Sequence, residues 1–219
     1  MRPLVTASLV LTLLFAACLG LIRAQPYHDS ELRAFVTPPD GCPMPCFLGI
    51  RPGVTTADEA LAILEAHEWV GEVYTYRSLE DRQIALINWN WTEKRSGLID
   101  SSQIASIHAV DRIVTDISIP THFSLGENWL VWGQPADTSY VVGLGGKDAP
   151  LYLQIFSSYS DMPMNITASM TCPYFPVLWH SPVTLTLHDG ENPLASLVDP
   201  YTEKSFLSFV IDLKHAACE

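Results

Sequence analysis

Basic residues are scarce in this 219-residue chain, which has 12 lysines and arginines against 24 aspartates and glutamates, a formal charge of −12. The acidic residues are scattered rather than gathered in runs. Proteins bind nucleic acid and anionic membrane surfaces through clusters of basic side chains. The charge balance therefore excludes a nucleic-acid partner, and the acidic residues have the ordinary effect of keeping the protein soluble.

Signatures of known catalytic sites are also missing. The sequence has no Gly-x-Ser-x-Gly motif, which marks the nucleophile of many hydrolases. Segment 145–148 (Gly-Gly-Lys-Asp) lacks the first glycine and the final serine or threonine of a phosphate-binding loop, and we expect a hairpin loop there. His67-Glu68 begins like a zinc-protease helix, but the second histidine is absent, and the seven histidines show no ligand spacing. The sequence predicts no catalytic residue, no metal and no cofactor.

An apolar run is the most informative feature that is present. It covers residues 4–22 and follows Arg2 at the N-terminus. This pattern is typical of an export signal or a membrane anchor, and it predicts that the rest of the chain lies outside the cytoplasm. Three interpretations remain open: cleavage after Ala24, lipidation of Cys18, or retention of about 19 apolar residues that could just span a hydrocarbon core of roughly 30 Å. Contact with a membrane is expected only through this segment.

Three regions follow from this reading. Residues 1–24 are the signal peptide or anchor, and their removal would leave 10 basic and 24 acidic residues, a charge of −14. Residues 25–45 contain five prolines and predict a rigid linker. Residues 46–219 are long enough for a single domain with one core.

Two helices are predicted, over residues 56–66 and 125–132. Each has a capping box, in which a threonine or serine (Thr56, Ser124) is followed three residues later by a glutamate. Apolar residues of the first helix lie on one face, and Gly133 ends the second. Alternating β-branched and aromatic residues predict strands at about 83–91, 103–108, 113–119, 138–143, 151–157, 164–170, 183–188 and 206–213.

The two helices suggest an internal repeat, because their caps and apolar positions coincide at an offset of 68 residues. We expect an α+β fold in which short helices pack on an antiparallel sheet. Its parts would be a tandem helix-then-strands repeat, about 49–119 and about 120–171, and a C-terminal β extension, 172–219.

The second predicted helix also carries a resemblance. Residues 124–135 resemble the helix signature of the small outer-membrane-assembly lipoproteins, which ends in hydrophobic-Gly-x-Pro. The first copy keeps the Gly-hydrophobic-Thr start at residues 53–55 but lacks the Gly-x-Pro end. The β-lactamase inhibitor proteins resemble a tandem duplication of this unit, and residues 49–80 are similar to segments of uncharacterised exported bacterial proteins. The resemblance covers about a third of the chain and implies helices laid on an antiparallel sheet. It transfers no functional residue.

One predicted strand is a candidate for ligand binding. Trp89 and Trp91 alternate with Asn88 and Asn90, so one face of the strand carries indoles and the other carries amides. A core face packed against helices is one interpretation. The other is an aromatic platform for a sugar or a small ligand.

Four cysteines lie outside the N-terminal run: Cys42, Cys46, Cys172 and Cys218. An even number in an exported chain predicts two disulfides. Prolines at positions 43 and 45 favour an extended chain between the first two cysteines, which would separate their Cα atoms by roughly 12 Å, whereas a disulfide needs less than about 7 Å. We therefore predict that Cys42 and Cys46 each pair with one of the two distant cysteines, in an order that stays open. Only a cis proline or a sharp turn would allow the local bridge.

Together these patterns predict an exported envelope or secreted module without catalytic activity, which binds a protein or acts structurally. The partner would be another envelope or extracellular protein, and the contact surface would be the sheet face that the helices leave uncovered. A carbohydrate or small-ligand binder is the alternative, and an extracytoplasmic hydrolase with a dispersed site is the second alternative.

Overall fold

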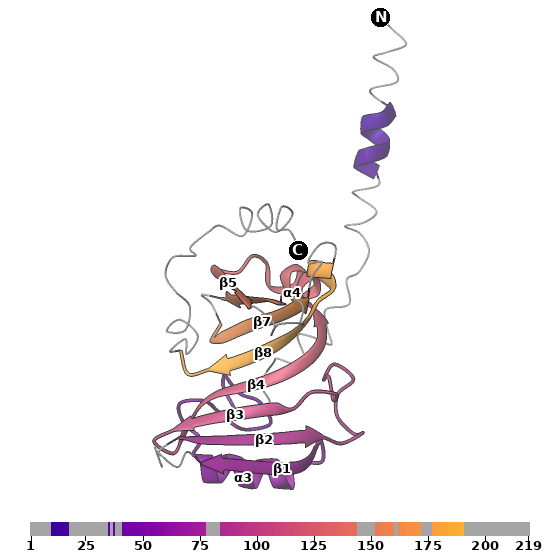
Figure 1. Ribbon diagram of the computed structural model, residues 1–219. Helices are drawn as coiled ribbons and strands as arrows, with labels where there is room; N and C mark the ends of the chain where they lie inside the picture. Colours follow the sequence, from indigo (N-terminus) through magenta and orange to yellow (C-terminus); the bar gives the residue numbers. More distant parts are fainter. Residues whose placement is uncertain are drawn as a thin grey trace, which may run out of the picture. The chain divides into compact units, whose positions relative to one another are not determined.

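The computed structural model (Figure 1) describes residues 10–17, 35, 37, 41–77, 84–143, 152–159, 162–171 and 177–190. The chain divides into two compact units, residues 1–35 and 36–219. In the first unit, residues 10–17 are helical. Among the described residues, no helix combines the length and the apolar character that a membrane crossing requires. The export segment therefore stays a prediction.

The second unit contains an eight-stranded antiparallel sheet with short helices, which confirms the predicted α+β class. The strands are β1 (Val70–Arg77), β2 (Ala85–Trp91), β3 (Ala105–Val110), β4 (Ile113–Ser124), β5 (Asp137–Gly143), β6 (Tyr152–Ser158), β7 (Met164–Thr171) and β8 (Pro182–His188). The helices are α3 (Ala57–Ala66), α4 (Leu125–Trp132) and the 3-10 turn η1 (Val177–His180). The strands lie in the order β1-β2-β3-β4-β8-β7-β6-β5.

This order joins two meanders of four strands. Each meander follows one helix in the sequence, α3 before β1–β4 and α4 before β5–β8, and the two meet where β4 pairs with β8. The strand predicted at 183–188 is therefore β8, an interior strand between β4 and β7, and not part of an added extension. The strand predicted at 206–213 lies outside the described residues.

Both predicted capping boxes are present. The hydroxyl of Thr56 accepts a hydrogen bond from the Glu59 amide at 3.2 Å, and the Glu59 carboxylate accepts one from the Thr56 amide at 2.9 Å. Ser124 and Glu127 repeat this geometry at 3.2 and 2.8 Å. Each box satisfies backbone amides that the first turn of a helix leaves without partners. Gly133 ends α4 at a φ of 77°, in the left-handed region that glycine enters freely.

The strand β1 and the short turn η1 are elements that the sequence patterns do not predict. The strands predicted at 103–108 and 113–119 are present and pair as the hairpin of β3 and β4, whose two-residue turn holds Asp111 and Arg112 at φ values of 51° and 70°. β1 pairs with β2 at the edge of the sheet, and a register shift falls between Val70 and Val73.

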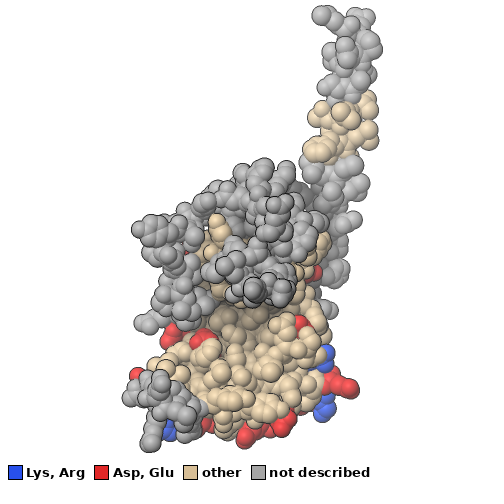
Figure 2. Space-filling view, in the orientation of Figure 1, with Lys and Arg blue, Asp and Glu red and all other residues tan. Residues whose placement is uncertain are grey.

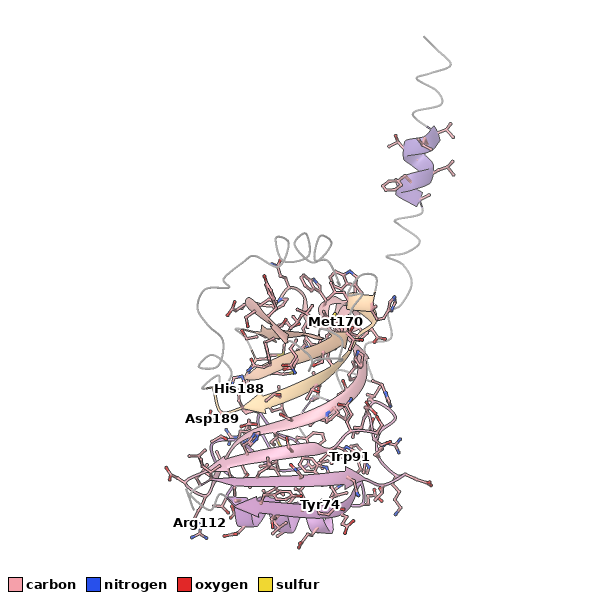
Figure 3. All side chains as sticks on the ribbon, in the orientation of Figure 1. Tyr74, Trp91, Arg112, Met170, His188 and Asp189 are labelled. Atoms are coloured by element: carbon pink, nitrogen blue, oxygen red, sulfur yellow. A yellow bond between two sulfur atoms is a disulfide. The ribbon has the colours of Figure 1, made fainter. Side chains whose placement is uncertain are left out.

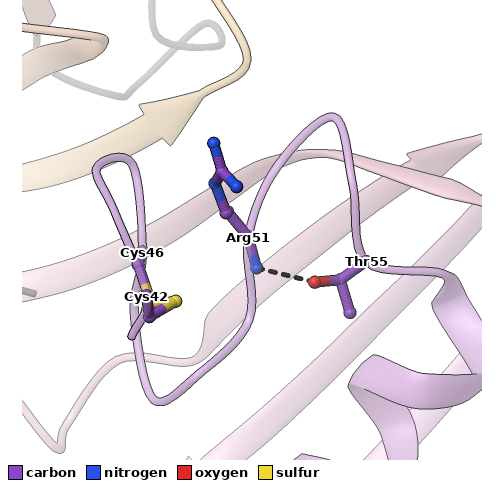
Figure 4. The surroundings of a disulfide bond; sticks show 4 residues. All are labelled: Cys42, Cys46, Arg51 and Thr55. Carbon is purple, nitrogen blue, oxygen red and sulfur yellow. Dashed lines mark hydrogen bonds between the residues drawn. A yellow bond between two sulfur atoms is a disulfide. The ribbon is translucent and has the colours of Figure 1, made fainter. Parts of the chain in front are cut away.

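The core lies on the sheet face that α3 covers. Ile87, Trp89 and Trp91 of β2 alternate toward it and are buried, together with Ile107 of β3 and Ile117 of β4. Figure 4 shows that the hairpin containing Cys42 and Cys46 also covers this face, on the same side of the strands as the start of α3.

The predicted cysteine pairing is wrong for the first two residues. Cys42 and Cys46 are bonded to each other, with their Cα atoms 5.9 Å apart. The chain is not extended between them, because the Met44–Pro45 peptide bond is cis and turns the backbone sharply. Cys172 and Cys218 lie outside the described residues.

Candidate functional site

The face of β1–β3 opposite α3 carries the candidate site. Directly paired residues of antiparallel strands share a face, and the register aligns Tyr74 with Asn88 and Ser106, and Tyr76 with Leu86 and His108. Asn90 lies two residues beyond Asn88 and therefore on the same side. We call this surface the open face and define it as Tyr74, Tyr76, Leu86, Asn88, Asn90, Ser106 and His108.

The open face is aromatic and amide-rich, and the carboxylates of Glu72 and Asp116 contact its Tyr74 and His108. Tyr76 is 57% exposed and Tyr74 is 38% exposed, although both occupy a regular strand. Figure 1 views the sheet with α3 behind β1, and from this side Figure 2 shows a largely uncharged surface over the lower strands, with acidic and basic atoms along its margin. An uncharged centre inside a charged margin is the usual anatomy of a protein interface.

The structure separates the four residues predicted to bind a ligand. Trp89 is fully buried and Trp91 is 9% exposed, and their rings make an edge-to-face contact at 5.4 Å in the core. The indoles therefore do not form a ligand platform, and the packing interpretation of this strand face is the correct one. Asn88 and Asn90 do lie on the open face, where the Asn90 side chain accepts a hydrogen bond from the Glu72 amide at 2.7 Å.

The aromatic residues of the site are Tyr74 and Tyr76. Neither is predicted from the sequence, because the predicted strands do not include β1. The alternation of valine, tyrosine and threonine from Val73 onward was the available signal. Tyr74 donates a hydrogen bond to the Glu72 carboxylate, and this bond raises the pKa of the phenol. Tyr74 is therefore a neutral hydrogen-bonding aromatic residue at any physiological pH.

Among the described residues, one ion pair involves a residue of the open face, and it joins His108 to an aspartate of the neighbouring strand β4. His108 Nδ1 lies 2.8 Å from Asp116 Oδ1, and the Thr115 hydroxyl lies 3.1 Å from Asp116 Oδ2. The Asp116 side chain is 9% exposed, whereas that of His108 is 49% exposed. The hydrogen bond to Asp116 raises the pKa of His108. The result is a buried carboxylate that holds a solvent-accessible imidazole in one orientation.

A second histidine follows in the same row. His188 of β8 is the direct cross-strand partner of Asp116 and is buried. Its Nδ1 accepts a hydrogen bond from the Gly190 amide at 3.2 Å, so this nitrogen carries no proton. Burial lowers the pKa of His188, against the opposing effect of the Asp189 and Asp116 charges.

The described part of the chain contains no group of three or more histidine, cysteine, aspartate or glutamate side chains placed to hold a metal ion. His108 and Asp116 could support proton transfer. The open face offers aromatic contact area, hydrogen bonds from amide and hydroxyl groups, and one imidazole, that of His108.

Comparisons with known proteins return nothing: no family model, no curated protein and no solved structure matches this chain.

Proposed function

We propose that this chain is an exported, non-catalytic module that binds another envelope or extracellular protein through the open face. The observation that carries the proposal is the exposure of Tyr74 and Tyr76 beside Asn88 and Asn90 on a face that α3 leaves uncovered. Tyrosines supply large contact areas at a low cost in side-chain entropy, and amides supply adaptable hydrogen bonds. These are the residue types that protein-binding surfaces favour.

The charge of the chain supports a partner of opposite sign at the margin of the interface. The acidic residues outnumber the basic ones by two to one, and in Figure 2 their atoms lie beside the uncharged centre rather than in it. Charges at the margin of an interface change the association rate more than the final affinity. We therefore expect association with the partner to slow as salt is added.

The two alternative functions, a carbohydrate or small-ligand binder and an extracytoplasmic hydrolase, are each supported by fewer residues of the site. A carbohydrate ligand would now have to use the tyrosines and amides of the open face, because Trp89 and Trp91 are buried. An extracytoplasmic hydrolase would have to draw its acid–base pair from His108 and Asp116.

Site-specific photo-crosslinking tests the proposal. A benzophenone amino acid is placed at Tyr76 in the full chain and, as a matched control, at Leu130, which is 71% exposed on α4 and lies outside the open face. Irradiation in the native envelope should give a discrete crosslinked protein from position 76 only, and Tyr74→Ala in the same chain should reduce its yield. An adduct of equal yield at both positions, or none at position 76, would contradict the proposal. An adduct that resists protease and contains sugar would favour the carbohydrate alternative.

We also infer that the two halves of the sheet arose by tandem duplication of a helix followed by four strands. The support is the 68-residue offset between the two capping boxes and the mirrored strand order about the β4–β8 pair. The repeats would then run from the first capping box to β4 and from the second to β8. A superposition of the two halves in an experimental structure that fails to match helix to helix and strand to strand in order would contradict the duplication.

A further inference from the structure

A line of three ionisable groups starts at His108 on the open face and runs across the neighbouring strands β4 and β8. His108, Asp116 and His188 are direct cross-strand partners on the neighbouring strands β3, β4 and β8. Because paired residues share a face, the line starts at an exposed imidazole and passes inward through a buried carboxylate to a buried imidazole. It crosses the β4–β8 pair that joins the two halves. Figure 3 marks its inner end with the labels of His188 and Asp189 at the end of β8.

The contact with Asp116 fixes which nitrogen of His108 titrates. An ionised carboxylate only accepts hydrogen bonds, so the Nδ1 atom 2.8 Å away carries a hydrogen in both charge states of the ring. The proton that is gained or lost therefore sits on Nε2. Since half of the His108 side chain is exposed, the ring is accessible to a group placed over the open face.

Among the described residues, the other charged groups near His108 are paired with another residue or exposed to solvent. Its neighbour on β2 is Leu86, which is uncharged. In the turn between β3 and β4, Arg112 donates to Asp58 on α3 at 2.7 Å, and Asp111 is exposed to solvent. Among the described residues, Asp116 is thus the charge that holds the His108 imidazole.

His188, the buried histidine of the line, does not take up a proton in place of His108 at neutral pH. His188 is buried and its Nδ1 accepts from the Gly190 amide, so it is a neutral ring with its hydrogen on Nε2. The charges that face it are Asp116 from β4 and Asp189 from the segment after β8. The outer histidine thus titrates first as the pH falls.

We propose that His108 makes binding at the open face proton-linked: the imidazolium held by Asp116 donates its Nε2 hydrogen to an acceptor group of the partner, and the neutral ring does not. This inference rests on the proposed protein-binding function and adds its regulation. In the neutral ring Nε2 has no hydrogen and is itself an acceptor. It then faces the acceptor of the partner, so the hydrogen bond is lost and the two lone pairs repel each other. Binding is then strongest below the pH at which His108 loses its proton.

A pH titration of His108 in the full chain, held in lipid nanodiscs, tests the protonation behaviour of this residue without any partner. Long-range ¹H–¹⁵N spectra report the protonation and the tautomer of each histidine, and His108→Gln assigns the signal by its disappearance. We expect a midpoint above the ordinary value of about 6.5, a neutral form protonated on Nδ1, and a lower midpoint in Asp116→Asn. A midpoint at or below the ordinary value, or a neutral form protonated on Nε2, would overturn the proposal.

Crosslinking from position 76 then tests the link to binding. The yield should be several-fold greater at about pH 5.5 than at about pH 8, and His108→Gln, which cannot titrate, should remove this difference. Circular dichroism at both pH values checks that each variant is folded. A product of equal yield at both pH values would refute the proton linkage alone. If no product forms at any pH, the protein-binding function fails, and the linkage fails with it.

Discussion

Removing the disulfide between Cys42 and Cys46 should destabilise the protein by much less than removing a long-range bridge would. The perturbation is the double substitution Cys42→Ala/Cys46→Ala. The bond closes a loop with a sequence separation of only 4. The residues that follow it remain anchored without it, because Phe47 and Ile50 are buried and Phe47 contacts the Trp91 ring edge-to-face at 6.3 Å.

The expected loss follows from the length of the closed loop. In the chain-entropy model, a loop of about five residues gives a stabilisation of about 2 kcal/mol at 25 °C. A bridge from the same cysteines to the C-terminal region would close more than a hundred residues, for which the model gives about 4.7 kcal/mol. The difference of roughly 2.6 kcal/mol lies well outside the error of a denaturant titration.

Chemical unfolding of the oxidised protein and of the double variant measures this loss. Peptide mapping without reduction should recover the disulfide that joins Cys42 to Cys46. A loss of free energy near 5 kcal/mol, or a peptide that joins Cys42 to Cys172 or Cys218, would refute the reasoning.

Three further outcomes are expected. Trp89→Ala should lower the free energy of unfolding by about 3–5 kcal/mol, because this indole is fully buried; a loss below about 1 kcal/mol in urea titration would contradict its place in the core. Thr56→Ala and Ser124→Ala should each cost about 1 kcal/mol by the same measurement, since their capping geometries agree within 0.1 Å; unequal losses differing by more than a factor of three would contradict equivalent caps. The raised pKa of His108 predicts stability that is fully present below the unfolded pKa of about 6.5 and is lost as the pH rises through the folded pKa. Unfolding curves measured across this range should lose that slope in Asp116→Asn, and an unchanged slope would contradict the ion pair.

Local chemistry made the helices and one hairpin predictable from the sequence. A capping box needs only a hydroxyl and a carboxylate three residues apart, so Thr56 and Ser124 identify both helix starts without any tertiary information. The same holds for the β3–β4 hairpin, where alternating strands flank a two-residue turn.

The orientation of β2 and the cysteine pairing depend on contacts that sequence patterns do not contain. Alternation separates Trp89 and Trp91 from Asn88 and Asn90, but it does not say which set faces the core, because that depends on which side α3 covers. The isomer of the Met44–Pro45 bond is likewise absent from the pattern of residues. The contact surface was expected on the sheet face that the helices leave uncovered. The tyrosines of that face were not predicted, because the strand that carries them, β1, was not predicted.

The mirrored strand order has a consequence for how an exported chain would fold. When the N-terminal half of the chain is available first, β1 to β4 can pair with one another as a meander. β4 then has one edge without a partner strand. That edge is covered only when β8 arrives, since Asp116 and Ile117 pair with His188 and Leu187, 70 or more residues later. The central pairing of the sheet is therefore the contact of highest sequence separation between its strands and the slowest to close. Until it closes, the unpaired edge of β4 is open to pairing with a strand of another chain, in the middle of what becomes the finished sheet.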